Sequence, residues 1–400
     1  MSRLNELIRE LCPDGVVYKK LEELGTFFSG LTGKSKDDFK DGNAKFITYR
    51  NVYSNPSLNM KIEDKVKIRD NEIQHIVKYG DILFTGSSET PDECGMSSVV
   101  TTEPDEKLYL NSFCFGLHLY NVDYFNIHYL KHVLRSNDIR KQIKKTASGV
   151  TRYNVSKKRF AKVCIPIPPI DVQNEIVRIL DTFTSHAAEL QAELQARKEQ
   201  YEYYRNKLLT FDKDDENVKW MKLPEICENL DKKRKAVTAS NRISGPYPYY
   251  GASGIVDYVN SYIFEGNYLL VSEDGANLLA RSTPIAFSIS GKNWVNNHAH
   301  VLKFHNIFTQ KYIEHYINMI DVAQYISGGA QPKLNQENLN KMLLPVPSQS
   351  EQQRIVFILD KFEALVNDLT EGLPAEIAAV QEQYEYYRNK LLSFPKIKES

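Results

Sequence analysis

Two long segments of this chain carry apolar residues at alternating steps of four and three positions. The first runs from Ile176 through Leu180, Phe183, Ala187, Leu190, Leu194, Arg197, Tyr201 and Tyr204 to Leu208, with Arg197 as its one polar member. This spacing places one apolar stripe along a helix that packs against another helix. A helix of roughly 35 to 40 residues spans roughly 50 to 60 Å. The pattern therefore predicts a long helix over this segment.

The second segment repeats the pattern, with one extra step of four near its middle. Its stripe consists of Ile355, Leu359, Phe362, Val366, Leu369 and Leu373, followed by Ile377, Val380, Tyr384, Tyr387 and Leu391. Four inserted residues are a stutter, which paired helices accommodate by local unwinding. Gly372 and Pro374 lie at this point and favour a kink or a break. We expect the two long helices to pack against each other.

Both segments belong to a repeat that organises the whole chain. EQYEYYRNKLL occurs at 199–209 and again at 382–392, and QNEIVRILDTF at 173–183 matches QQRIVFILDKF 179 residues further along. Four more pairs correspond at that offset, namely Pro166 and Pro345, Pro168 and Pro347, Ser148 and Ser327, and Gly149 and Gly328. The repeating unit is a glycine loop, a Pro-x-Pro entry and a long helix.

Two regions of different sequence separate the repeated parts, one ending near Cys164 and one from Asp212 to Leu344. Both contain short runs such as GDILFTG and NYLLVSEDG, which are typical of strands. Each opens with a similar phrase, VVYKKLEEL from Val16 and VKWMKLPEI from Val218. We expect two α/β (α+β) domains with bent β-sheets in a pseudo-two-fold repeat. The expected boundaries are 1–165, 166–211 for the first helix, 212–344, and 345–400 for the second helix and tail.

The charge of the chain is balanced, with 51 basic and 51 acidic residues, so affinity for nucleic acid needs a local basic surface. Between Leu130 and Lys162, eleven Lys or Arg accompany a single acid, Asp138. Several of them crowd one short helical pattern, namely Arg140, Lys141, Lys144 and Lys145. This segment indicates a phosphate-binding surface, and a solvated basic face without a ligand is an equally weighted alternative.

The cysteines and histidines do not form a metal-ligand pattern. Five scattered cysteines are never spaced as Cys-x-x-Cys, which argues against a disulfide framework and a zinc site. For His298 and His300 no third ligand is evident, so a structural role or a base contact is favoured over a metal. No stretch approaches 18 consecutive apolar residues, and the charged start is unlike a secretory signal. We expect a cytoplasmic protein with reduced cysteines and no membrane partner.

Patterns typical of enzymes are incomplete in this chain. Gly30 to Ser35 resembles the end of a phosphate-binding loop, but its first glycine lies two residues too close. Asp92, Asp105 and Lys107 are a loose set of the metal-dependent nuclease kind, and such sets recur by chance in a sequence with 26% charged residues. The Pro-Pro-aromatic motif of amine methylation is absent. We therefore expect no catalytic residue, no cofactor and no metal.

Several phrases together resemble the specificity subunits of type I restriction-modification enzymes. They are LCPDGVVYKKLEEL near the start, YPYYGASGIVDY from Tyr247, GKNWVNNHAHVL from Gly291, both Pro-x-Pro entries and both YEYYRNKLL helix ends. The resemblance covers essentially the whole chain. It implies two target-recognition domains, each binding one half of a bipartite duplex DNA target, separated by two conserved helices that form an antiparallel coiled coil. It also implies two methyltransferase subunits and restriction subunits with motor and nuclease activity as partners of a non-catalytic chain.

Polar side chains on loops read base edges, while basic groups and backbone amides hold phosphates. In the first domain we expect DNA contacts from Arg50, Asn51, Thr85, Ser87, Ser88, Glu89, Lys141, Lys144, Lys145, Arg152 and Tyr153. In the second domain we expect them from Ser253, Asn277, Arg281, Asn296, Asn297, His298, Gln331 and Lys333. Gly149, Gly328 and Gly329 let the backbone approach a phosphate closely. For any single residue, an exposed loop position without a contact is an equally good interpretation.

Other functions stay open at this point. One is a coiled-coil scaffold that binds proteins and no DNA, against which the basic segment argues. Another is the specificity subunit of a different multisubunit methyltransferase-nuclease, which only the partners distinguish. A third is a self-sufficient nuclease, which requires metal-dependent cleavage by the isolated chain. The sequence does not determine which bases are recognised.

Overall fold

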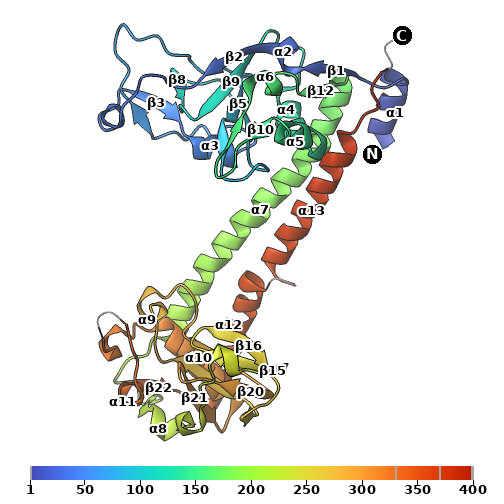
Figure 1. Ribbon diagram of the computed structural model, residues 1–400. Coiled ribbons are helices and arrows are strands. Elements are labelled where there is room, and N and C mark those ends of the chain that lie inside the picture. Colours follow the sequence, from blue (N-terminus) through green and yellow to red (C-terminus); the bar gives the residue numbers. More distant parts are fainter. Residues whose placement is uncertain (1, 329–330, 369–370, 398–400) are drawn as a thin grey trace. The chain divides into compact units, whose positions relative to one another are not determined.

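The computed structural model describes residues 2–328, 331–368 and 371–397, so the predicted stripe residue Leu369 and the predicted loop residue Gly329 lie outside the described residues. The chain divides into two compact units. Unit 1 comprises Met1–Glu189 and Ile377–Ser400, and unit 2 comprises Leu190–Glu376. Each unit combines strands and helices (Figure 1). The predicted mixed fold of two similar units is confirmed.

Unit 1 is organised around the antiparallel sheet β2-β9-β5-β7. Smaller sheets have the strand orders β4-β3-β8, β10-β11-β6 and β1-β12. The strands are β1 (Val17–Lys20), β2 (Gly25–Ser29), β3 (Ala44–Ile47), β4 (Lys65–Val66), β5 (Ile82–Thr85), β6 (Ser87–Ser88), β7 (Ser97–Val99), β8 (Leu108–Leu110), β9 (Cys114–Leu119), β10 (Ala147–Ser148), β11 (Tyr153–Val155) and β12 (Cys164–Ile167). The short helices are α1 (Ser2–Leu11), α2 (Leu21–Leu24), α3 (Tyr49–Ser54), α4 (Ile127–Val133), α5 (Asn137–Lys144) and α6 (Lys157–Phe160).

Unit 2 repeats this plan with the antiparallel sheet β14-β21-β18-β19, beside the sheets β16-β15-β20-β17 and β13-β22. The strands are β13 (Lys219–Lys222), β14 (Cys227–Asn229), β15 (Ser244–Gly251), β16 (Gly254–Val259), β17 (Phe264–Glu265), β18 (Tyr268–Ser272), β19 (Ala286–Ile289), β20 (Lys292–Val295), β21 (Ala299–Phe304) and β22 (Leu343–Val346). The short helices are α8 (Leu223–Ile226), α9 (Asn277–Ala280), α10 (Ile307–Met319) and α11 (Gln336–Lys341).

The first predicted long helix is α7 (Ile170–Leu209), a continuous helix of 40 residues. The second is divided into α12 (Gln349–Asn367) and α13 (Leu373–Leu391), so the predicted interruption is confirmed. Gly372 lies in the turn between these helices, where an added Cβ would come within 2.6 Å of the Ala364 carbonyl oxygen. No side chain fits at that distance, and a glycine is therefore required.

The same aromatic pair holds the long helices together in each unit. In unit 1, α7 and α13 run in opposite directions (Figure 1), and Phe183 stacks on Tyr387 with ring centroids 5.3 Å apart. In unit 2, Phe362 of α12 stacks on Tyr204 of α7 at 5.6 Å. Phe183 and Phe362 are repeat partners, and so are Tyr204 and Tyr387. The repeat in sequence is therefore a repeat in packing.

The Pro-x-Pro sequences begin on strands β12 and β22, and in each unit a buried tyrosine hydrogen-bonds to the carbonyl of the first of the two prolines. Tyr129 and Tyr312 have no exposed surface, and their hydroxyls donate to the carbonyls of Pro166 (3.1 Å) and Pro345 (3.0 Å). A buried phenol needs such a partner, since an unmade hydrogen bond costs about 1 to 3 kcal/mol. The strand pairs β1-β12 and β13-β22 carry these prolines in matching register.

A histidine from each globular part contacts the same position on its long helix. His132 Nε2 lies 2.7 Å from Asp181 Oδ1 in unit 1, and His315 Nε2 lies 2.8 Å from Asp360 Oδ1 in unit 2. Both histidines are almost completely buried. Asp181 and Asp360 are repeat partners, so these contacts fasten each globular part to its helix in the same way.

The two ends of the chain meet in unit 1. Val16 donates its amide to the Pro395 carbonyl (2.9 Å), and Ile397 donates back to the Val16 carbonyl (3.2 Å). The hydroxyl of Tyr18 donates to the Phe394 carbonyl (2.8 Å). Among the helices in the described part of the chain, none has the length and apolar character needed to cross a membrane.

Candidate nucleic-acid interface

The basic segment of unit 1 contributes to both the interior and the surface. The guanidinium of Arg135 donates to the carbonyls of Ser97, Val52 and Tyr53, and burial lowers its pKa to about 10. Arg140 donates to three carbonyls between residues 92 and 95. These two arginines are therefore structural. The exposed basic residues of the segment are Lys141, Lys144, Lys145, Arg152, Lys157, Lys158, Arg159 and Lys162.

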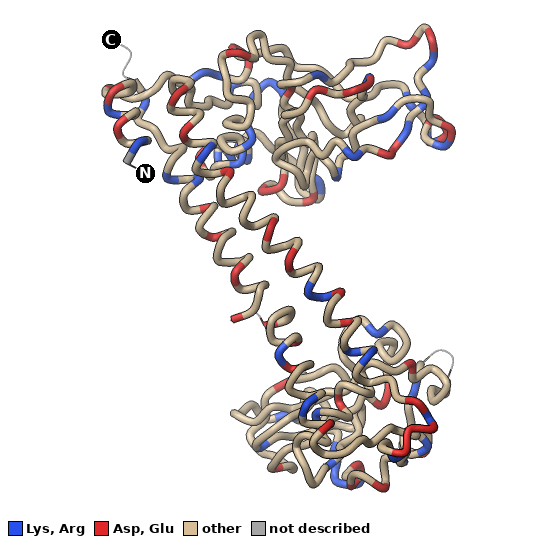
Figure 2. The backbone as a smooth tube through the Cα atoms, turned by 180° about the vertical axis from the view of Figure 1, so that it is seen from behind, with Lys and Arg blue, Asp and Glu red and all other residues tan. Residues whose placement is uncertain are grey.

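Outside such local groups, basic and acidic residues are interspersed along the backbone of both units (Figure 2). Even within the predicted lysine cluster, Lys144 pairs with Asp92 (2.5 Å) and Lys141 lies 3.7 Å from Asp138. Both pairs are exposed, so a polyanion replaces the carboxylate at little cost. Lys141, Lys144 and Lys145 thus remain available to phosphates.

Two predicted groups of the first domain come together around a hollow of about 490 Å³. Its walls are formed by Tyr49, Tyr53, Ser87, Ser88, Glu89, Glu93, Phe113, Thr151 and Arg152. Arg152 donates through Nε and Nη2 to Ser87 Oγ (3.2 and 3.0 Å), and its guanidinium lies 5.3 Å from the centre of the Phe113 ring. Tyr153 pairs with Ser88 across the β11-β6 ladder. The contacts with Ser87 and Phe113 therefore fix the orientation of the exposed Arg152 side chain without a ligand.

The hollow contains residues that the sequence interpretation missed. Glu93 accepts hydrogen bonds from Tyr53, Thr90 and Ser88, which hold the pKa of Glu93 below its usual range. Phe113 is 56% exposed, which is unusual for an aromatic side chain. The four-residue spacing of Tyr49 and Tyr53 is a helical signal, but the β-branched and aromatic content of residues 45–53 favours a strand. The structure has a strand only at Ala44–Ile47 and the helix α3 at Tyr49–Ser54. Of the residues that were missed, Glu93 and Phe113 had no local signal in the sequence.

Two predicted contacts of the first domain are used within the fold. The expectation is wrong for Thr85, which is fully buried and accepts the Met96 amide through its hydroxyl (2.9 Å). The Asn51 side chain donates to the Asn59 carbonyl (2.8 Å) and accepts from the Asn59 amide (3.2 Å). Arg50 is exposed beside a second hollow of about 310 Å³ and remains a candidate.

In unit 2, the predicted Asn277 and Arg281 stabilise a loop. Asn277 accepts from Ser282 and Thr283 and donates to the Thr283 carbonyl. Arg281 has a positive φ of 52° and donates to three carbonyls at the C-terminal end of α10. These contacts hold both side chains against the fold, and they argue against base reading by either residue.

The other predicted residues of unit 2 differ in accessibility. Ser253 is exposed in the turn between β15 and β16, and Asn297 is exposed before β21. Asn296 is buried, and its side chain accepts the amide of His298 (2.8 Å). His298 is exposed, with Nδ1 2.9 Å from the Asp274 carboxylate. Ser253, Asn297 and His298 therefore remain candidates, whereas Asn296 supports the turn.

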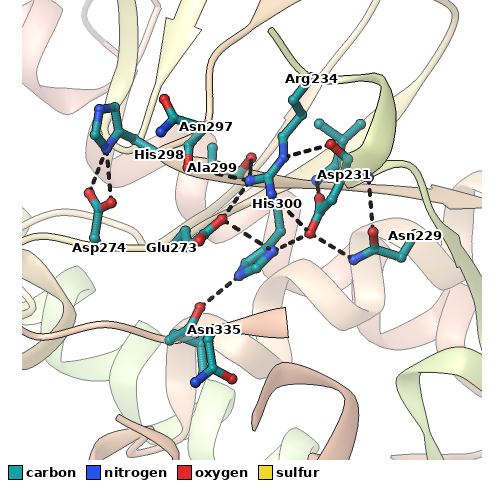
Figure 3. A network of polar contacts seen from close by, with 12 residues as sticks. Asn229, Asp231, Arg234, Glu273, Asp274, Asn297, His298, Ala299, His300 and Asn335 are labelled. Atoms are coloured by element: carbon teal, nitrogen blue, oxygen red, sulfur yellow. Dashed lines mark hydrogen bonds and ion pairs between the residues drawn. The ribbon is translucent and has the colours of Figure 1, made fainter. Parts of the chain in front are cut away.

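The second histidine of the predicted pair belongs to a buried network (Figure 3). His300 lies 2.6 Å from Asp231 and 3.8 Å from Glu273, and this trio has the spacing of metal ligands. Arg234 contacts both carboxylates, at 3.3 and 2.6 Å. Burial alone would raise the pKa of Asp231, but the hydrogen bond from His300 lowers it below its usual range. The arginine supplies the positive charge that a metal would bring, so we interpret the network as structural.

A second trio with metal-ligand spacing is His315, Asp360 and Glu363 in unit 2. In the unit 1 counterpart, the Asp181 carboxylate contacts both His132 Nε2 (2.7 Å) and Lys131 Nζ (2.8 Å), and these contacts hold the globular part on the helix. Neither trio with this spacing in the described part of the chain includes the nuclease-type Asp92 or Asp105.

The remaining predicted residues of unit 2 are Gln331 and Lys333, both exposed. Lys333 exchanges backbone hydrogen bonds with Ser327, and its Nζ lies 3.1 Å from Glu273. Gln331 lies between them in sequence. Ser327 and Lys333 correspond at the repeat offset to Ser148 and Asn154, which pair in unit 1.

The chain belongs to the family of type I restriction modification DNA specificity domains, which it matches twice, over residues 13–200 and 215–379. It is 37% identical over 268 residues to the EcoR124I/EcoR124II type I restriction enzyme specificity subunit of Escherichia coli, covering 61% of this chain and 65% of that protein. It is 36% identical over 180 residues to a putative type I restriction enzyme specificity subunit of Haemophilus influenzae, covering 44% and 46%. The matches thus span less than two thirds of both relatives.

A likeness in fold extends over nearly the whole chain. The S subunit of a type I restriction-modification system from M. genitalium superimposes with a TM-score of 0.53 at 16% identity, covering 94% of this chain and 96% of that one. At this identity the likeness concerns the fold alone.

Proposed function

We propose that this chain is the DNA specificity subunit of a type I restriction-modification enzyme. Each of its two units binds one half of a bipartite duplex target, and the chain delivers methyltransferase and restriction subunits without catalysing a reaction itself. The observation that carries the proposal is the double occurrence of one family domain, with corresponding tyrosine and histidine contacts in both units and dissimilar loops. Identical frames with different loops are suited to reading two different half-sites.

The proposed partners are two copies of one methyltransferase subunit. Tyr203 and Tyr386 are repeat partners, and each is 59% exposed. Lys207 lies over the first ring (5.7 Å) and Lys390 over the second (5.5 Å), so the same surface occurs in each unit. Packing explains identical buried residues in a repeat, but it does not explain identical exposed ones. A partner that binds both copies in the same way supplies the reason.

An exchange of one variable region tests the proposed function. Residues 16–164 are replaced by the corresponding region of a homologous chain, and the modified bases in the cell's genome are mapped before and after. We expect only one half of the modified sequence to change, with the other half and the spacer retained. The matched control replaces 212–344 and should change the opposite half. Loss of both halves, or modification that is independent of this chain, would contradict the proposal.

A further inference from the structure

The hollow beside β6 and β11 in unit 1 combines aromatic rings with charged groups. Tyr49 and Tyr53 stack on α3 with ring centroids 6.1 Å apart, and Phe113 adds a ring that is 56% exposed. The Tyr49 hydroxyl donates to the Ser87 carbonyl (2.7 Å), so α3 is held against β6. The guanidinium of Arg152 lies in the same wall as Phe113. A ligand of this hollow therefore meets flat apolar surfaces and a few fixed polar groups.

Arg152 has donors that remain available to a ligand. Its Nε and Nη2 each donate one hydrogen to Ser87 Oγ (3.2 and 3.0 Å). No other hydrogen bond or ion pair of this guanidinium is found in the described part of unit 1. A guanidinium carries five N–H donors in one plane, so two hydrogens on Nη1 and one on Nη2 are unused. The terminal edge of the group thus offers two adjacent donors, and the contacts with Ser87 and Phe113 fix its plane.

Two carboxylates make a phosphate a poor ligand for this hollow. Hydrogen bonds from Tyr53 and two other hydroxyls hold the pKa of Glu93 below its usual range, so this side chain is ionised at neutral pH. Glu89 is exposed at the same hollow, and no partner of its carboxylate is found among the described residues. Two acidic groups therefore accompany the single positive charge of Arg152, and like charges repel a phosphate. The hollow favours a neutral group that carries hydrogen-bond acceptors.

The base edges of duplex DNA are neutral and carry such acceptors. In the major groove, guanine presents two adjacent acceptors, N7 and O6, whereas adenine presents one acceptor and one donor. The two free donors at the terminal edge of Arg152 match the guanine edge. Against adenine, one of these donors would meet another donor. The chemistry of the hollow therefore selects guanine among the four bases.

We infer, resting on the proposed function, that Arg152 reads a guanine in the half-site bound by unit 1, and that Ser87 is its positioning residue. The guanidinium is already oriented in the free protein, so little side-chain freedom is lost when the base binds. Exposed lysines outside the hollow, such as Lys145, contact phosphates and add affinity without base choice.

Single base-pair substitutions in the target test this assignment. The target is mapped in the genome, and the exchange of residues 16–164 identifies the half-site of unit 1. The full chain with its methyltransferase partner then binds duplexes in which each base pair of that half-site is replaced in turn. For the wild type, replacing one G·C pair should weaken binding roughly 5- to 100-fold. In Arg152→Gln this penalty should disappear at that pair alone, and the penalties at all other positions should stay the same.

A modified base tests the contact more directly. The analogue 7-deazaguanine lacks N7 but keeps the base pair and the charge of the duplex. At the identified position it should weaken binding of the wild type roughly 2- to 10-fold and leave binding of Arg152→Gln unchanged.

Two further variants separate positioning from charge. Ser87→Ala keeps the arginine but removes the acceptor that orients it, so the guanine penalty should shrink roughly 2- to 10-fold. Lys145→Gln is the matched control, since it removes one exposed positive charge outside the hollow. It should weaken binding to every duplex by the same factor and leave the guanine penalty intact.

Three results would overturn the inference while the wild-type complex still binds its target. The first is a half-site of unit 1 that contains no G·C pair. The second is an equal weakening of all duplexes by Arg152→Gln, which would make this residue a phosphate contact. The third is unchanged binding in Arg152→Gln, which would place the hollow outside the DNA interface. If the wild-type complex binds no duplex specifically, the proposed function itself fails.

Discussion

The contact between His132 and Asp181 yields a prediction whose size follows from the structure. Asp181→Ala removes the acceptor for His132 Nε2 (2.7 Å) and Lys131 Nζ (2.8 Å). The histidine is 1% exposed and its other nitrogen already contacts the Tyr384 hydroxyl (2.9 Å). A buried donor left without a partner costs about 1 to 3 kcal/mol, and the unpaired lysine adds to it. We expect unit 1 to lose about 2 to 3 kcal/mol.

The lowered pKa of Asp181 gives an independent and smaller value for the free energy that its contacts contribute to unit 1. Burial alone would raise its pKa, but the hydrogen bonds from His132 and Lys131 outweigh burial and lower the pKa to about 2. Against an ordinary 3.8, this shift corresponds to about 2.4 kcal/mol. The carboxylate is 36% exposed, so solvent screening reduces the contribution to about 1 kcal/mol. The remainder of the predicted loss is the cost of the unpaired buried histidine.

Asp360→Ala is the matched variant in unit 2. It removes the partner of His315, but Glu363 lies 4.0 Å from the other ring nitrogen and offers a second acceptor. No lysine contact to Asp360 occurs in the described part of the chain, so the expected loss is only about 1 kcal/mol.

Local hydrogen exchange measures the two losses separately. Exchange in α4 should accelerate about 30- to 150-fold in Asp181→Ala, since each 1.4 kcal/mol is a factor of ten, and α10 should change about 5-fold in Asp360→Ala. Both tryptophans, Trp220 and Trp294, lie in unit 2, so their fluorescence during urea unfolding reports on Asp360→Ala alone. Equal effects in the two units, or less than a 3-fold change in α4, would refute this reasoning.

Three other predictions concern pH, catalysis and the long helix. Because the folded-state pKa of Asp181 is lowered, its stabilisation should be complete above about pH 4 and lost as the pH falls towards 2, and Asp181→Asn should flatten that part of an unfolding profile. The purified chain should neither cut nor methylate a duplex with any divalent metal, and metal-dependent cleavage that Asp105→Ala abolishes would be the contrary result. Four residues inserted near Ala192 should lengthen α7 by about 6 Å and the unread spacer of the modified sequence by roughly one to two base pairs. An unchanged spacer with full activity would mean that the length of the helices does not determine the number of base pairs between the half-sites.

The repeat and the long helices could be predicted from the sequence, because they depend on periodicity. Apolar residues at alternating steps of four and three form a stripe on a helix regardless of what the rest of the chain does. The predicted helix is found as α7, which covers Ile170–Leu209. The break was also local, since Gly372 and Pro374 act through their own backbone geometry. The Ser-Gly pairs at Ser148-Gly149 and Ser327-Gly328 could also be predicted, because they repeat at the same offset in the sequence.

Tertiary structure alone decided which polar residues face solvent. Thr85 and Arg281 have the chemistry of DNA contacts, yet burial holds the first and hydrogen bonds to distant carbonyls hold the second. Arg152 has the same chemistry but is held at the surface by Ser87, 65 positions away in sequence. A polar group's partner depends on which segments the fold brings together, and strand pairing between remote segments leaves no periodic trace in the sequence.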